Sequence, residues 1–200
     1  PPGAKALPRL GFAAIDELRA ADMQRLTQLE RVVLPVTLTS IDKDVFSQSP
    51  GLRYVDMLML DADLTADVKT RGLADLGINT QQTLVYLPKE YGETQETNVV
   101  VNSGTSLSAQ TFRLVDGKDY CVPYAFTAAT VENTRSFATA GSLYTVCLPY
   151  ELNVPAGATA YQLSERDGNQ LVFTAVTGKL EAMQPYLIKT ASANVTLGTD

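Results

Sequence analysis

LERVVLP (residues 29–35) and LRYVDML (residues 52–58) share the frame Leu-x-x-Val-x-apolar and start 23 positions apart. Apolar residues also recur between the two segments, at positions where they can point inward: Leu38, Ile41, Val45 and Phe46. A period in the low twenties with this frame is typical of a leucine-rich repeat, in which each unit contributes one short strand and returns through a helical or irregular arc. We therefore predict a short repeat segment here. The alternative is a helix followed by two unrelated strands.

The residues before this repeat predict a short helical start. Residues 1–12 are rich in proline and are expected to form a loop. Apolar residues then follow a roughly helical spacing at Ile15, Leu18, Met23, Leu26 and Leu29. The side chain of Asp22 is expected to cap a helix over residues 23–28, because it can accept hydrogen bonds from the first free amides.

From about residue 80 the pattern changes to short β-strands rich in β-branched and aromatic residues. The predicted strands cover residues 83–88, 98–102, 111–115, 119–126, 142–150, 159–163, 170–176 and 185–189. Asp116-Gly117 and Asp167-Gly168 are hairpin signals between such segments. The predicted fold class is α+β, mostly β. Residues 1–75 form the repeat segment with its helical start, and residues 76–200 form an antiparallel β-sandwich.

Composition excludes several classes of function. The 200-residue chain carries a net charge of -6, so it should repel nucleic acid and lacks the basic face that anionic membranes attract. No apolar run approaches the length of a membrane-spanning helix, so no direct membrane insertion is expected in this chain. Histidine is absent, which excludes Ser-His-Asp and Cys-His catalysis and any metal site with a histidine ligand. We predict no enzymatic activity, no cofactor and no metal.

Two cysteines begin the same frame, Cys-apolar-Pro-Tyr, at Cys121 and Cys147. Neither has a second cysteine two to four positions away, so the spacing for zinc or for a redox pair is missing. We expect two small, buried, free thiols on related strands, and a disulfide in an exported protein remains the alternative. Pro123 and Pro149 should each mark a strand edge, end or bulge, because proline cannot donate to a ladder.

Acidic residues gather in two places. Asp61, Asp63 and Asp67 could supply oxygen ligands for calcium, but an EF-hand loop would need Gly and Glu where the chain has Ala66 and Gly72. We interpret this stretch as a solvated acidic loop or a helix start. Glu90, Glu93 and Glu96 surround Tyr91, and paired carboxylates could serve glycoside hydrolysis. A polar loop between two strands explains these glutamates better.

Tyrosine is the residue type best suited to contact a ligand in this chain, because tryptophan is absent and nine tyrosines are present. Tyr54, Tyr91 and Tyr161 lie in or beside predicted loops and are the candidate ligand contacts. The alternative for each is a side chain half-buried on a sheet.

The chain resembles the BspA-like leucine-rich-repeat proteins of the Bacteroidetes cell surface. The repeat part of the resemblance consists of LRAADMQRLTQLERVVLP (residues 18–35) and LTSIDKDVFSQSPGLRYVDM (residues 38–57). The later part resembles a β-rich domain that often follows such repeats, through LVYLP, NVVVN, YCVPYAFTA, YTVCLPYELNVPAG, AYQL, LVFTAV and PYLIK. The matching residues extend from about residue 18 to residue 189.

The resemblance implies a noncatalytic secreted or surface module for adhesion or protein interaction, anchored to the outer membrane through a part outside this chain. The implied partner is a host or bacterial surface protein, or a glycan. A carbohydrate-binding module of a glycan-capture system is the alternative function. The repeat array is short, so a long concave binding face is not expected.

Overall fold

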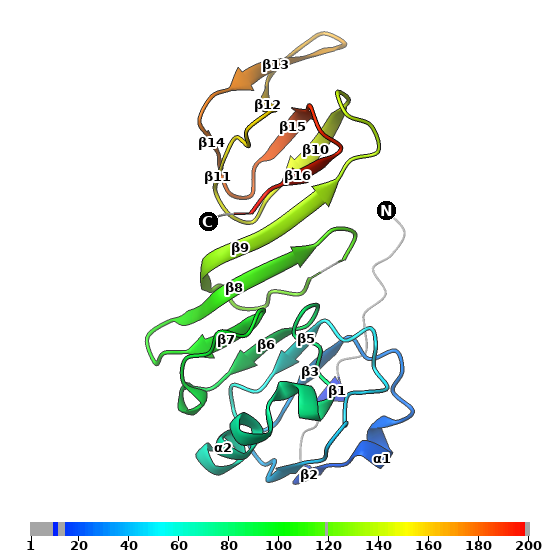
Figure 1. Ribbon diagram of the computed structural model, residues 1–200, viewed down its shortest axis with the longest axis vertical. Helices are drawn as coiled ribbons and strands as arrows, with labels where there is room; N and C mark the ends of the chain where they lie inside the picture. The colour runs from blue at the N-terminus through cyan, green and yellow to red at the C-terminus, as the bar shows by residue number, and fades with distance from the viewer. Residues whose placement is uncertain (1–9, 12–14, 119, 199–200) are drawn as a thin grey trace. The chain divides into compact units, whose positions relative to one another are not determined.

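The structure is a computed structural model that describes residues 10–11, 15–118 and 120–198. The chain divides into two compact units, unit 1 ending at Thr130 and unit 2 beginning at Val131. Strands make up most of the regular structure (Figure 1), so the predicted α+β, mostly β class is confirmed. Most of the predicted loop at residues 1–12 lies outside the described residues, while residues 10 and 11 form a short strand.

Unit 1 is built on a sheet with the strand order β1-β3-β5-β6-β7-β8, followed by the first residues of β9. Its strands are β1 (Leu10–Gly11), β2 (Glu17–Leu18), β3 (Arg31–Val33), β4 (Ser40–Ile41), β5 (Tyr54–Asp56), β6 (Leu84–Leu87), β7 (Val99–Asn102), β8 (Leu107–Val115) and the start of β9 (Thr127–Ser136). Its helices are α1 (Ala20–Met23) and α2 (Ala62–Arg71), with 3-10 turns η1 (Leu73–Leu76) and η2 (Lys89–Tyr91). Strands β1 to β7 in this sheet are parallel, and β8 is antiparallel to β7.

The two segments that share the Leu-x-x-Val frame lie side by side in this sheet. Strands β3 and β5 pair in parallel with Val32 opposite Val55, an offset of 23 residues. The hydroxyl of Ser49 donates to the carbonyl of Leu26 over the same offset of 23 residues. This is the register that a repeat of that length requires, because equivalent residues of successive units then stack on one another.

The stacking of parallel strands continues beyond the part of the chain where the sequence period can be recognised. Val55 lies opposite Val85, and Val85 lies opposite Val99. The chain that connects neighbouring strands is therefore longer than one repeat between β5 and β6 and shorter than one repeat between β6 and β7. The boundary predicted between residues 75 and 76 therefore falls inside unit 1, within η1. Sequence analysis missed this because β6 and β7 continue the parallel sheet without repeating the leucine spacing.

The core of unit 1 lies on one face of the sheet, between the strands and the returning arcs. Val32, Val55, Val85 and Val99 point into it from successive strands. The arcs contribute the residues that were expected to point inward and that are all buried: Leu38, Ile41, Val45 and Phe46. Helix α2 closes the core with Leu64 and Val68.

The predicted start of the chain is partly wrong. The helix α1 ends at Met23, where the predicted helix over residues 23–28 was to begin, and its N-cap residue is Arg19. Asp22 therefore lies in the first turn and does not cap the helix. The backbone amide of Ala20 instead donates to the Asp42 carboxylate at 2.9 Å, one repeat further along the chain. Stacking of the arcs, and not a local capping residue, sets the position of this helix.

All strand pairs recorded among the described residues of unit 2 are antiparallel. Its strands are the remainder of β9, β10 (Leu143–Cys147), β11 (Leu152–Asn153), β12 (Ala158–Asp167), β13 (Gln170–Val176), β14 (Lys179–Leu180), β15 (Pro185–Thr190) and β16 (Asn194–Thr196). Four of them form a sheet in the order β10-β15-β12-β13, while β11 pairs with β14 and β16 with β9. The inner face of the four-stranded sheet packs Val146, Ala160 and Ile188 against Val195 and Leu180 of the two smaller ladders.

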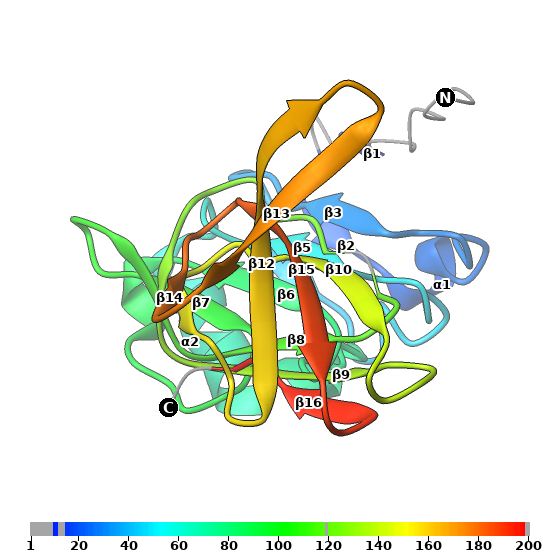
Figure 2. The same ribbon diagram turned by 90° about the horizontal axis from the view of Figure 1, so that it is seen from above.

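Most predicted strands after residue 80 are confirmed: β6, β7, β8, β10, β12, β13 and β15 lie within the predicted segments or extend them, although β10 ends at Cys147 and not at residue 150. Asp167 ends β12, and Gly168 and Asn169 form the turn into β13 that closes the hairpin, with Gly168 at a φ of 57° that favours glycine. Figure 2 shows the far half of this hairpin extending away from the rest of unit 2. The predicted strand over residues 119–126 is wrong: residues 120–126 form no strand, and Asp119 lies outside the described residues.

Gly77 permits a close approach between two arcs of unit 1. It ends η1 with a φ of 79°, and a Cβ atom at this position would lie 2.5 Å from the Ser47 backbone nitrogen. That contact sits beside the bond from the Phe46 amide to the Leu76 carbonyl, at 2.9 Å. Only a residue without a side chain satisfies both the conformation and the space.

We predict that Gly77→Ala lowers the free energy of unfolding by about 3 kcal/mol or more, because backbone strain and a clash with main-chain atoms add together. The matched control is Gly117→Ala, where φ is 73° but no atom lies within 4 Å of the added Cβ. Strain alone should cost this variant about 1–2 kcal/mol. Urea unfolding followed by circular dichroism measures both values. Equal losses in the two variants would contradict the close approach.

Candidate functional site

The three tyrosines that sequence analysis selected do not form one site. Tyr54 and Tyr91 are buried in unit 1, with exposed fractions of 4% and 3%. Their faces are closed to a ligand, so their selection as ligand contacts is wrong. Tyr161 lies in β12 of unit 2, half-buried, on the side of the sheet that points away from the core. Of the three, it alone faces an open surface, in a groove of about 500 Å³.

Tyr54 is buried because a segment of the chain, residues 120–126, lies over the second face of the unit 1 sheet. We call this segment the strap. Tyr86 of β6 stands between Tyr54 and the strap, with edge-to-face ring contacts at 5.6 Å to Tyr54 and 5.5 Å to Tyr124. The Tyr86 hydroxyl donates to the Tyr124 carbonyl at 2.8 Å, and Phe126 packs against Tyr86 at 6.1 Å. Such aromatic pairs contribute about 0.5–1.5 kcal/mol each beyond the area that they bury.

A carboxylate is buried under the same cover. Asp56 is 3% exposed, and it accepts hydrogen bonds from the Tyr54 hydroxyl at 2.8 Å and from the Leu58 amide at 3.0 Å. Burial, followed by the hydrogen bond to Asp56, raises the pKa of Tyr54 well above its ordinary value. Burial also raises the pKa of Tyr86. Both phenols therefore stay neutral and keep donating at physiological pH.

The two Cys-apolar-Pro-Tyr frames have different structural roles in the two units. Cys121 belongs to the strap and is half-buried, while Cys147 ends β10 and is exposed. Both thiols are free, but the prediction that both are buried on related strands is wrong. Tyr124 contributes its backbone carbonyl to Tyr86. Tyr150 instead uses its hydroxyl, which donates to the Leu197 carbonyl at 2.7 Å.

The acidic segment at residues 61–67 starts a helix. Asp61 is the N-cap of α2, and its carboxylate accepts from the Leu64 amide at 2.7 Å. Asp63 lies in the first turn, and Asp67 pairs with Arg71 at 3.1 Å. These roles agree with the helix-start interpretation. Among the described residues, no group of three or more His, Cys, Asp or Glu side chains is arranged to hold a metal ion.

The three glutamates around Tyr91 lie in different surroundings. Glu90 belongs to η2, Glu93 lines a groove, and Glu96 accepts from the Tyr91 hydroxyl at 3.3 Å. Burial, followed by the negative charge of Glu96, raises the pKa of Tyr91 to about 12. Glu96 is thus held by a structural contact, and Glu93 is the one carboxylate among the described residues that line the groove.

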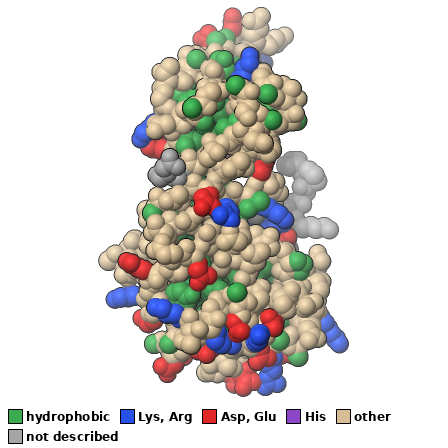
Figure 3. Space-filling model, in the orientation of Figure 1, with side chains coloured by type: hydrophobic (Ala, Val, Ile, Leu, Met, Phe, Trp, Pro, Cys, Tyr) green, Lys and Arg blue, Asp and Glu red, His purple; other side chains and the backbone are tan. Residues whose placement is uncertain are grey.

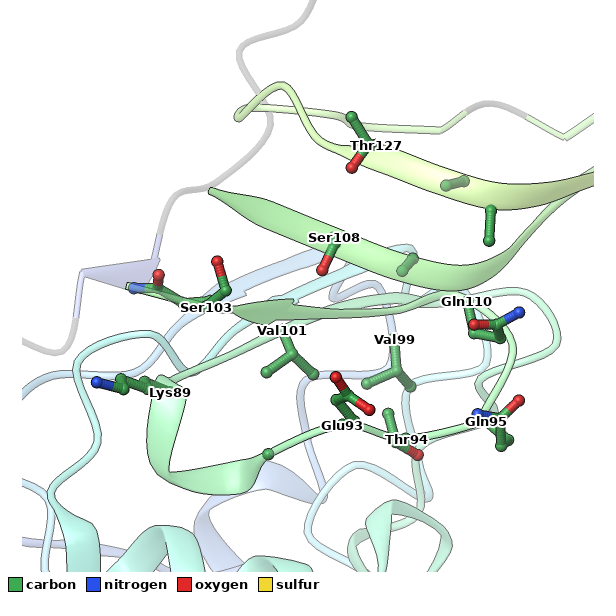
Figure 4. A pocket seen from close by; sticks show the side chains of 15 residues that line it. Lys89, Glu93, Thr94, Gln95, Val99, Val101, Ser103, Ser108, Gln110 and Thr127 are labelled. Atoms are coloured by element: carbon green, nitrogen blue, oxygen red, sulfur yellow. The ribbon is translucent and has the colours of Figure 1, made fainter. Parts of the chain in front are cut away.

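This groove of unit 1 has a volume of about 640 Å³, within the range of small-molecule sites. Figure 4 shows Val99 and Val101 pointing from β7 toward the segment that carries Glu93 and Thr94. The rest of the lining consists largely of amide and hydroxyl side chains, among them Gln95, Ser108, Gln110 and Thr127. Among the described residues that line it there is no aromatic side chain on which a sugar ring could stack.

A second surface lies around Tyr161 in unit 2. In the four-stranded sheet, Tyr161 is opposite both Leu187 and Ala175, and Leu163 is opposite Phe173. Paired residues point to the same side of a sheet, so these side chains share one face. We call it the outer sheet face, and its apolar members are Leu143, Tyr161, Leu163, Leu171, Phe173, Ala175, Pro185 and Leu187.

The outer sheet face is apolar and exposed. Leu143, Leu163 and Leu171 keep 55%, 50% and 58% of their surface accessible, and Phe173 keeps 38%. Figure 3 shows hydrophobic side chains among polar ones on the visible side of unit 2. Leu143, Tyr161, Phe173 and Leu187 line the groove around Tyr161, together with Lys189. A contiguous apolar surface of this kind marks an interaction site more often than scattered single residues do.

The charges on this face have one sign. Register places Lys189 and Arg166 on the outer sheet face, opposite Leu143 and Leu171. The acidic neighbours Glu165 and Asp167 alternate to the other side of β12. Within a chain whose net charge is -6, the described residues of this face thus carry two cations and no carboxylate.

Sequence analysis identified these strands but missed the exposed face. A signal was present in QLVFTAV (residues 170–176), where apolar residues occupy consecutive positions and therefore both faces of one strand. Such a strand fits a position buried on both sides. In the structure Val172 and Val176 are half-buried, whereas Leu171 and Phe173 are exposed.

No family model, curated protein or solved structure matches the chain. None of the described helices has the length and apolar character needed to cross a membrane.

We predict that Tyr86→Phe loosens the strap by removing the hydroxyl that donates to the Tyr124 carbonyl. Loss of one such bond costs about 1 kcal/mol, so opening of the strap should become roughly fivefold more frequent. In a Cys147→Ser background, the rate at which a thiol reagent modifies Cys121 reports this opening. Tyr144→Phe is the matched control, because its hydroxyl is bonded to Thr139 in unit 2. An unchanged Cys121 rate in Tyr86→Phe would contradict the role of the hydroxyl.

The raised pKa of Tyr91 predicts a loss of stability at alkaline pH. An unfolded tyrosine ionises near pH 10 and folded Tyr91 near 12, so its contribution is complete below pH 10 and falls as pH rises further. By pH 12 the loss should reach about 2–3 kcal/mol. Urea unfolding between pH 9 and 12 should show a shallower decline in Tyr91→Phe, which cannot ionise. Parallel declines in the two proteins would show that Tyr91 is not held neutral.

Proposed function

We propose that the chain is a noncatalytic module of a secreted or cell-surface bacterial protein, and that it binds a protein partner through the outer sheet face of unit 2. The observation that carries this proposal is the continuous exposed apolar surface around Tyr161. Burial of exposed leucine and phenylalanine side chains supplies the main favourable free energy of most protein associations. A partner that covers Leu163 and Phe173 would remove them from water.

The charge of the face indicates the chemistry of the partner. Lys189 and Arg166 lie among the apolar residues, and both are exposed. A partner segment that presents apolar side chains with Asp or Glu beside them would pair with these cations. Charge pairs at the margin of an interface contribute more to orientation and rate of association than to affinity. The proposed partner is therefore an apolar, acidic protein segment.

The cellular setting is proposed from the resemblance to BspA-like surface proteins of Bacteroidetes. Two features support it: the parallel pairing of β3 and β5 at an offset of 23 residues, and the sheet of unit 2 that follows the repeats. On this proposal the chain would serve adhesion or protein interaction at the cell surface, with its anchor in another part of the protein.

Glycan binding is the second candidate function, and the groove of unit 1 favours it. Its amide and hydroxyl side chains, such as Gln95 and Gln110, are of the kind that bind sugar hydroxyls without charge. Its volume of about 640 Å³ would hold a short oligosaccharide.

One pair of screens on the purified chain tests both candidates. A displayed library of random peptides should yield binders that combine apolar residues with Asp or Glu. Their binding should weaken at least tenfold in Leu163→Lys, which places a charge in the apolar face, and also in Lys189→Glu. Lys179→Glu is the control, because Lys179 lies in β14, outside the four-stranded sheet, where it pairs with Glu151.

Each result has a distinct meaning. Peptides whose affinity is unchanged by Leu163→Lys would contradict protein binding at the outer sheet face. A screen that enriches no peptide would also contradict it. A glycan array probes the second candidate with the same protein. Glycan binding that is lost in a Gln95→Ala, Gln110→Ala double variant and kept in Leu163→Lys would assign recognition to the groove of unit 1 instead.

A further inference from the structure

Strand β13 is an edge of the four-stranded sheet in unit 2, since the strand order is β10-β15-β12-β13. It runs for seven residues, Gln170–Val176, and contains no charged residue and no proline. Natural sheets usually protect a long edge with charge, proline or a covering segment, because unpaired backbone groups invite another strand. This edge has none of the sequence features that block pairing.

The direction of the backbone groups of β13 follows from one side-chain contact. The Ser164 hydroxyl of β12 donates to the Val172 carbonyl at 3.0 Å, so this carbonyl points toward β12. Backbone groups alternate along a strand, so the N–H and C=O groups of Leu171, Phe173 and Ala175 point away from β12. No described residue forms a hydrogen bond with these outward groups.

The opposite edge of the sheet is protected. In β10 the carbonyl of Thr145 accepts a hydrogen bond from the Arg135 guanidinium at 2.9 Å. Arg135 also lies over the ring of Phe137, at 5.2 Å, which fixes its position. A strand arriving at β10 would have to displace this arginine. The two edges of one sheet therefore differ, and β13 is the one open to pairing.

We propose that β13 pairs antiparallel with β13 of a second copy of this chain, so that two four-stranded sheets join into one. The strand is self-complementary when the two-fold axis passes beside Phe173. Phe173 then faces its own copy, and Leu171 faces Ala175 of the other chain. Each of these three pairs consists of residues whose backbone groups point outward, so together they form about six hydrogen bonds.

Side chains and charge favour the same register. Leu171, Phe173 and Ala175 all belong to the outer sheet face, so the pairing continues one apolar surface across both copies. A pair of aromatic side chains at the axis adds cross-strand packing. No like charges meet along the strand, although the whole chain is acidic. Since β10 is occupied by Arg135, the association closes as a dimer and does not propagate into a filament.

The test is the oligomeric state of the whole chain and of Ala175→Pro, measured by sedimentation velocity over a range of concentrations. Proline at this position removes an outward N–H and leaves the bonds to β12 intact, so unit 2 should still fold. We expect a concentration-dependent dimer for the native chain. In the variant, the concentration at which half of the chains are dimeric should rise about tenfold or more.

One control variant and one exchange measurement separate this pairing from the partner-binding face. Leu143→Lys changes the outer sheet face but lies on β10, at the opposite edge of the sheet from β13, so it should leave the dimer unchanged while weakening peptide binding. Amide hydrogen exchange should show protection of Leu171, Phe173 and Ala175 that increases with protein concentration. A chain that stays monomeric at about 500 µM, or a dimer that Ala175→Pro does not weaken, would overturn the proposal.

Discussion

Parallel backbone pairing between β3 and β5 is the constraint on which the rest of unit 1 depends. It sets the register at 23 residues, and equivalent apolar residues such as Val32 and Val55 then stack in one core. Each fully buried valine or leucine contributes about 1.5–3 kcal/mol, so a register error that turned this row outward would remove the core. The later strands β6 and β7 add to the same sheet, and their connecting arcs need only reach the next position in the stack.

A sheet whose strands are short and whose core lies on one face must still cover the other face. In unit 1 the strap covers part of it, through Tyr86, Tyr124 and Phe126. The buried Asp56 is tolerated there because the Tyr54 hydroxyl and a backbone amide satisfy it. The face that would otherwise be open for a ligand is thus occupied by the chain itself, which is why the functional proposals rest on other surfaces.

In unit 2, by contrast, one face of the four-stranded sheet is left uncovered. Its four-stranded sheet buries one face against β16 and the β11–β14 ladder and leaves the outer sheet face exposed. Covering that face, or pairing the free edge of β13, requires another molecule. The apolar face and the edge are separate features, since side chains form the first and backbone groups form the second. The two proposed associations can therefore be tested independently.

Local sequence patterns were enough to predict the repeat, its offset of 23 residues, the inward positions of its arcs, and most strands after residue 80. These features follow from local periodicity and from turn residues such as Gly168, which act over short distances along the chain. Strand β9 could not be predicted in this way, because its TAATVENTRS pattern is too polar to indicate a strand. That strand forms because long-range neighbours supply its hydrogen bonds, with Val195 of β16 opposite Arg135.

Long-range packing, in contrast, sets which tyrosines can meet a ligand and which contacts each Cys-apolar-Pro-Tyr frame makes. Tyr54 and Tyr161 occupy similar strand positions in sequence terms, yet one lies beneath the strap and the other faces solvent. Exposure depends on what a distant segment covers, and periodicity carries no information about that. The physical reason is that side-chain direction is a local property of the strand, whereas burial is a property of everything packed against it.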